Sequence, residues 1–164
     1  MTDLYISALQ ATAILSLILF LKVVVINLYL GYAKNNAGGR SPEDKYQQEE
    51  GQVTQESVQA QFRAQRMVNN DLENVPYGMI LGWGALLCIN FVQDEEAKDS
   101  YSLTHIVAFT TFVVGRVLHS LFYAFAVSLF RSLSYLLGVI AMFAISVNAV
   151  IASLNIESSN ASIA

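Results

Sequence analysis

Long apolar stretches alternate with short polar ones along the whole chain. A helix needs about 20 mostly apolar residues to cross the hydrocarbon core of a bilayer, and four stretches meet this requirement. They predict helices over about residues 4–33, 54–92, 102–128 and 131–156. The fold class expected for residues 1–164 is therefore a single all-α membrane domain, a bundle of four transmembrane helices.

The predicted loop between the first two helices, about residues 34–53, is hydrophilic and begins with asparagines and glycines that end helices. Val58 and Phe62 then lie four residues apart among polar residues, which indicates that the second helix starts outside the membrane. Pro76 lies inside this helix and removes one backbone hydrogen bond, so a kink is expected there.

Composition supports the membrane assignment and narrows the function. Hydrophobic residues make up 54% of the chain and charged residues only 13%, whereas soluble domains carry about 25% charged residues. The net charge of −4 and the lack of a basic tract argue against nucleic acid as a partner. A single cysteine, Cys88, excludes an intrachain disulfide and a cysteine-rich metal site, and no metal is expected.

Charged residues outside the helices predict the orientation, because short cytosolic loops are enriched in lysine and arginine. The loop after the first helix and the start of the second helix carry Lys34, Arg40, Lys45, Arg63 and Arg66, and the turn between the third and fourth helices carries Arg131. The opposite side carries mainly acidic residues, in a predicted loop over 94–99 and near both chain ends. We therefore expect lumenal termini and a cytosolic position for the first and third connections.

Three predicted helices carry polar residues at the same depth, near the expected cytosolic side. Ionisable residues inside a span are costly and by default mark function. On each helix the spacing places them on one face or within one turn. They are Arg66, Asn70, Glu73, Asn74 and Tyr77; then Arg116, His119 and Tyr123; then Arg131, Ser132 and Tyr135.

This polar cluster has two interpretations. Forked arginine donors suit carboxylates, so the cluster predicts a site for a small zwitterion with more than one carboxylate. Arg131 near a helix start could also stabilise a thiolate. Alternatively, the side chains pair internally, Arg116 with Glu73 and Lys22 with Asp71. We favour internal pairing for Lys22 and a binding site for the cluster as a whole, and we expect Arg63 on a solvated helix face.

Three motifs in fixed order carry a resemblance to a known family. They are Arg66, Asn70, Asp71, Leu72, Glu73 and Asn74; Val114, Gly115, Arg116, His119, Ser120 and Tyr123; and Arg131, Ser132, Leu133, Ser134 and Tyr135. Over about residues 15–145 the chain resembles the MAPEG family, the membrane-associated proteins in eicosanoid and glutathione metabolism. The branch with microsomal glutathione transferase 1 and microsomal prostaglandin E synthase 1 is most similar, and Pro42, Glu43 and Asp44 also look like an element of that branch.

The resemblance implies a homotrimer in the endoplasmic reticulum or mitochondrial outer membrane. Glutathione would bind between neighbouring protomers near the cytosolic face, in contact with membrane lipids. The residues that would hold it are Arg66, Asn70, Glu73, His119, Tyr123 and Tyr135, with Arg116 in support. Arg131 and Ser132 would lower the pKa of the thiol, and Asp44 matches a loop acid to which a catalytic role has been assigned.

The resemblance leaves three activities open. The first is a glutathione transferase or peroxidase acting on a lipophilic electrophile or lipid hydroperoxide. The second is isomerisation of a prostaglandin endoperoxide. Leu136 and Val139 argue against this activity, because the pattern of that enzyme has polar residues at these positions. The third is a non-catalytic lipid-binding scaffold, which would not need Arg131 and its neighbours. Val68 and Asn69 replace a basic residue of the family pattern, which implies either weaker glutathione binding or a different contact to its γ-glutamyl or glycyl end.

Overall fold

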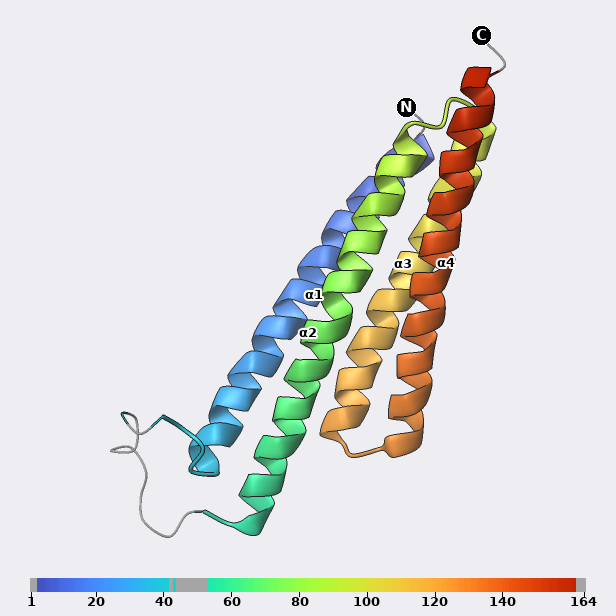
Figure 1. The fold of residues 1–164 in the computed structure, drawn as a ribbon. Coiled ribbons are helices and arrows are strands. Elements are labelled where there is room, and N and C mark those ends of the chain that lie inside the picture. The colour runs from blue at the N-terminus through green and yellow to red at the C-terminus, as the bar shows by residue number, and fades with distance from the viewer. Residues whose placement is uncertain (1–2, 42, 44–52, 162–164) are drawn as a thin grey trace.

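The computed structural model describes residues 3–41, residue 43 and residues 53–161, the last five of these by their backbone alone. The described residues form four α-helices, α1 (Asp3–Asn36), α2 (Gln55–Asn90), α3 (Glu95–Ala124) and α4 (Ser128–Ala161) (Figure 1). All four are long and apolar enough to cross a membrane. The predicted all-α fold of four membrane-spanning helices is therefore confirmed.

The helices run up and down, so that each end of the bundle collects particular connections. The start of α1, the end of α4 and the link between α2 and α3 lie at one end, while the turn between α3 and α4 lies at the other (Figure 1). We call this second end, where α1 also finishes and α2 begins, the turn end. Among the described residues α1 packs on α2 and α3, α4 packs on the same two helices, and α1 and α4 do not touch. The middle of the bundle is therefore made by α2 and α3.

Local capping residues determine where two of the helices begin. Thr54 and Ser57 form reciprocal hydrogen bonds of 3.1 Å at the start of α2, which satisfies free backbone N–H groups. The Asp94 carboxylate accepts from the backbone N–H of Glu96 at 3.0 Å and starts α3. The predicted start of this helix at residue 102 is therefore wrong, because the segment after Asp94 is helical rather than a loop. Helix α4 likewise starts at Ser128, before the predicted residue 131.

The centre of the bundle is apolar, and α3 and α4 approach each other closely. The central cluster contains the fully buried side chains of Leu19, Phe109 and Phe112. A Cβ atom on Gly115 would lie 3.1 Å from the backbone oxygen of Ser134 in α4. Small residues allow this close approach of two helix backbones, which fixes the position of the polar residues that follow on α3.

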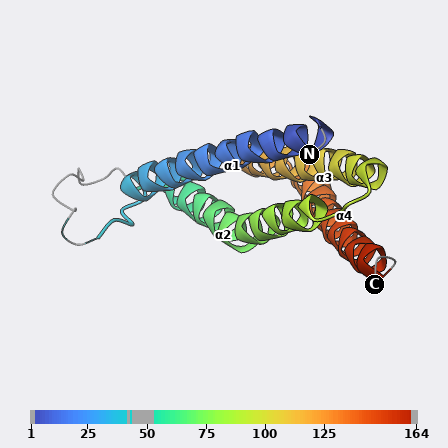
Figure 2. The same cartoon turned by 90° about the horizontal axis from the view of Figure 1, so that it is seen from above.

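Helix α2 is not straight. It continues through Pro76, and Figure 2 shows a bend in its middle part. A proline inside a helix leaves one carbonyl without its donor and commonly causes such a bend. The half of α2 before the bend, toward the turn end, carries the polar residues that face α3 and α4.

Candidate functional site

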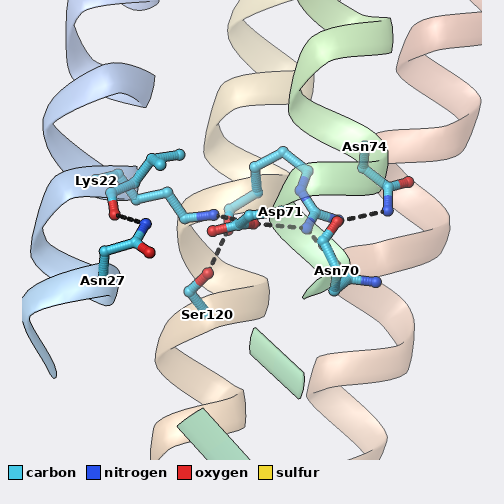
Figure 3. Close-up of polar contacts among 8 residues, drawn as sticks. Lys22, Asn27, Asn70, Asp71, Asn74 and Ser120 are labelled. Atoms are coloured by element: carbon cyan, nitrogen blue, oxygen red, sulfur yellow. Dashed lines mark hydrogen bonds and ion pairs between the residues drawn. The ribbon is translucent and has the colours of Figure 1, made fainter. Parts of the chain in front are cut away.

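Three ionised side chains from three helices meet inside the bundle (Figure 3). Lys22 of α1 donates to Oδ1 of Asp71 of α2 at 2.5 Å, and Nη2 of Arg116 of α3 donates to the same oxygen at 2.9 Å. The same Nη2 also donates to Oδ1 of Asn70. The side chains of Arg116 and Asp71 are only 1% and 3% exposed. We call these four residues the buried network; its charges are two cations and one carboxylate.

The buried network decides between the expected pairings. The internal pair of Lys22 and Asp71, which we favoured, is confirmed. The alternative pairing of Arg116 with Glu73 is wrong, because Arg116 pairs with Asp71. Two residues along a helix correspond to a rotation of about 200°, so Asp71 and Glu73 point to different sides of α2. Asp71 faces α1 and α3, whereas Glu73 is exposed in the single chain. Arg116 is therefore occupied by internal contacts.

An aromatic cluster joins α3 to α4. The His119 ring, buried on α3, lies 5.7 Å from the ring of Tyr123 and 6.2 Å from the ring of Tyr135. The guanidinium carbon of Arg131 lies 4.7 Å from the centre of the Tyr123 ring, in cation–π geometry. Residues that are distant in sequence, on α3 and α4, are thus held in one group.

A cavity of about 510 Å³ opens at the turn end, beside this aromatic cluster. Its walls come from the first turns of α2, the end of α3, the turn after it and the start of α4. The lining residues are Gln59, Phe62, Arg63, Arg66, Tyr123, Ala126 and Arg131. Three of these are arginines, and no described lining residue is acidic. The size lies within the range of small-molecule sites, and the charge suits an anionic guest.

Comparison with known proteins identifies the family. The model of the MAPEG family matches residues 12–151, a range that contains the cavity and the buried network. The chain belongs to the MAPEG family. Membership indicates glutathione-related transferase or isomerase chemistry in general terms. No curated protein and no solved structure matches the chain.

In this MAPEG protein, five of the predicted site residues lie in or beside the cavity. Arg66, Tyr123 and Arg131 line it, the His119 ring packs against Tyr123, and the Tyr135 ring packs against His119. The first motif, on α2, and the two motifs on α3 and α4 are therefore brought together at one end of the bundle. This arrangement agrees with the common depth that the sequence predicts for them.

The remaining predicted residues lie elsewhere. Asn70 and Arg116 bind each other in the buried network. Glu73 and Ser132 are exposed in the single chain and do not line the cavity, and the Ser132 hydroxyl donates to the backbone oxygen of Ser128 at 3.1 Å. Asp44 lies outside the described residues.

Part of the cavity wall on α2 was not predicted from the sequence. Arg63, which we expected on a solvated helix face, lines the cavity together with Gln59 and Phe62. A signal was present, because Gln59, Arg63 and Arg66 follow the i, i+4, i+7 spacing of one helical face. The family motif on α2 begins only at Arg66, so it includes neither Gln59 nor Arg63.

The turn that forms another part of the wall contains a strained residue. Ala126 has a φ of 61°, the left-handed conformation that usually requires glycine. Its N–H donates to the backbone oxygen of Tyr123 at 3.2 Å, and the N–H of Val127 donates to that of Phe122 at 2.9 Å. These two bonds form a Schellman motif. The turn thereby places the start of α4, and Arg131 with it, opposite the arginines of α2.

Proposed function

We propose that this MAPEG protein is a membrane-bound glutathione transferase that also reduces lipid hydroperoxides. It would bind glutathione, ionise its thiol and direct the sulfur at a lipophilic electrophile that arrives from the bilayer. The observation that carries the proposal is the cavity that Arg66, Tyr123 and Arg131 line together, with no carboxylate among its described lining residues. Family membership supports glutathione as the guest.

The contacts of Arg131 leave it able to stabilise the thiolate of glutathione. Its guanidinium lies over the face of Tyr123, so a ring rather than a carboxylate holds it, and its charge stays available. A fixed cation near a thiol favours the thiolate and lowers the thiol pKa. We assign Arg131, with Ser132 next to it at the start of α4, to the thiolate. The ionised sulfur then attacks the electrophilic carbon, and the leaving group departs with the bonding electrons.

The neighbouring residues would hold the rest of the tripeptide. The Oδ1 atom of Asn70 is taken by Arg116, so the amide NH₂ of Asn70 is the group able to donate to a ligand oxygen. Arg116 thus acts by orienting Asn70. His119, Tyr123 and Tyr135 would supply ring faces and polar tips, and Arg66 would bind a carboxylate. Asp44 stays a candidate for a catalytic acid in the first connection.

The exposed polar face of α2 supports an assembly of several protomers. Asn69, Glu73 and Tyr77 are exposed in the single chain, although they lie within a membrane-spanning helix at i, i+4 and i+8. Polar and ionised groups facing lipid are costly, so this face should meet protein. We propose a homotrimer in which Glu73 binds the ammonium group of glutathione at a protomer boundary. We propose further that the turn end faces the cytosol, in the endoplasmic reticulum or mitochondrial outer membrane.

The decisive experiment measures thiolate formation in purified protein. On mixing with glutathione, the wild type should develop the thiolate absorbance band and should conjugate a halogenated nitrobenzene. Arg131→Gln should lower the turnover number by about 100-fold, the usual effect of removing one group that stabilises developing charge. The turnover number of Arg131→Lys, which keeps the positive charge but not the forked donors, should lie between those of the wild type and Arg131→Gln. An undiminished thiolate band in Arg131→Gln would refute the assignment.

Two readouts separate the alternative activities. A lipid-binding scaffold would show no heat of glutathione binding in calorimetry. Peroxidase activity would convert two glutathione molecules and one hydroperoxide to the disulfide, an alcohol and water. An isomerase would instead rearrange a prostaglandin endoperoxide without consuming glutathione, and this result would replace the transferase proposal.

A further inference from the structure

The cavity contains one arginine more than the family motifs supply. Arg63 lines it together with Arg66 and Arg131. No carboxylate of the described residues forms an ion pair with Arg63 or Arg66. Arg63 is half-buried in the wall, so part of its hydration is already lost. An arginine in such a place has hydrogen-bond donors directed at the cavity and no internal partner for them.

The number of arginines matches the number of anionic groups in the proposed guest. Glutathione with an ionised thiol has two carboxylates, one thiolate and one ammonium group. Arg131 suffices for the thiolate and Arg66 for one carboxylate, which leaves Arg63 for the second carboxylate. Arginine is suited to this contact because its forked donors bind both oxygens of a carboxylate.

The order of residues along α2 indicates which carboxylate this is. Of the charged residues of α2 proposed to bind glutathione, Arg63 lies nearest the turn end. Glu73 follows ten residues later, about 15 Å along the helix axis. Glu73 is the acid proposed for the ammonium group, so the γ-glutamyl end belongs near the middle of the bundle. The glycyl end, which carries a carboxylate and no ammonium, then lies at the mouth. Gln59, one turn before Arg63 on the same face, offers an amide donor there.

We propose that Arg63 binds the glycyl carboxylate of glutathione, and thereby makes this protein select tripeptides with a free C-terminal carboxylate. This inference rests on the proposed function. Arg63 is a binding residue rather than a catalytic one, because it lies at the far end of the tripeptide from the thiol. Its removal should therefore change the affinity for glutathione and not the turnover number at saturating glutathione.

The test is calorimetry on the purified full-length protein with glutathione and with its C-terminal amide, in which the glycyl carboxylate is neutral. Arg63→Gln should weaken glutathione binding by about 10- to 150-fold, the range of one charged hydrogen-bonded pair. The wild type should bind the amide more weakly by a similar factor. The variant should bind glutathione and the amide with equal affinity.

Two controls make the result specific. Lys34→Gln removes one positive charge from the last turn of α1, outside the cavity, and should leave both affinities unchanged. An analogue without the α-carboxylate of the γ-glutamyl group should bind more weakly than glutathione by the same factor to the wild type and to Arg63→Gln. Circular dichroism should show that both variants keep the helical fold.

The possible failures are distinguishable. If the wild type binds no glutathione, the proposed function fails and the role of Arg63 fails with it. If the wild type binds but Arg63→Gln binds equally well, only the role of Arg63 is wrong. If Arg63→Gln weakens the binding of glutathione and of the amide by the same factor, Arg63 does not contact the glycyl carboxylate and the proposal is overturned.

Discussion

The buried network and the cavity use the same kind of side chain for opposite purposes. In the buried network Arg116 is 1% exposed and shares the Asp71 carboxylate with Lys22. In the cavity Arg63 and Arg66 have no ion pair with a described residue. A buried arginine needs its partner in order to be tolerated at all, whereas an unpaired one at a cavity wall can bind a ligand. The residues available for binding are therefore those that the fold has not neutralised.

The strongest way to break this contrast is to remove the shared carboxylate. Asp71→Asn leaves Lys22 and Arg116 as two uncompensated cations inside a membrane-spanning bundle. The loss should be about 3–5 kcal/mol of unfolding free energy, the usual result of removing one partner of a buried ion pair. Thermal unfolding in detergent, followed by circular dichroism, measures it. Glu95→Gln, an exposed acid in the first turn of α3, is the matched control, and an equal melting temperature for the two variants would contradict the prediction.

A second substitution sharpens the contrast by removing a cation instead. Lys22→Met keeps the pair of Asp71 and Arg116 and reduces the net charge of the network from plus one to zero. The stability change should stay within about 1 kcal/mol, because the lost attraction is offset by the lost desolvation penalty of the ammonium group. The same unfolding measurement applies. A loss as large as that of Asp71→Asn would mean that Lys22, rather than the carboxylate, is the essential member.

The smallest expected effect concerns the cavity wall. Ala126→Gly should raise the unfolding free energy by about 0.5–1 kcal/mol, because glycine adopts the left-handed conformation without steric penalty. Ala124→Gly, at the last helical residue of α3, is the control and should lower stability, since glycine disfavours a helix. If both variants lost stability equally, the strain at Ala126 would be unimportant.

Much of the fold follows from the sequence because membrane spans have a simple requirement. Length and hydrophobicity predict the four helices, and one polar capping residue explains the main error, the late start assigned to α3. Asp94 can end a loop or begin a helix, and hydropathy cannot distinguish the two. The pairing of Lys22 with Asp71 was also predictable, since two opposite charges in neighbouring apolar spans have few other partners.

The rest of the site depends on how helices rotate against one another. Asp71 and Glu73 are equally good partners for Arg116 by composition, and only the packing of α2 on α1 and α3 selects Asp71. Arg63 looked like a solvated residue because it lies before the apolar part of α2. Its place in the cavity depends on the turn around Ala126, which brings α4 back across the start of α2. Alanine at that position gives no sequence signal for a left-handed turn.

The buried network also has a consequence for how the protein enters its membrane. Lys22, Asp71 and Arg116 lie on three different helices, so each of α1, α2 and α3 would be inserted with its member of the network unpaired. A charged residue at the centre of a single inserted helix costs about 2.5–3.5 kcal/mol on translocon scales. Separated helices would expose all three charged groups to lipid, and these groups are shielded from lipid only when the helices associate. Insertion should therefore proceed with early pairing of α1 and α2 and prompt addition of α3, while α4, which has no member in the network, can join last.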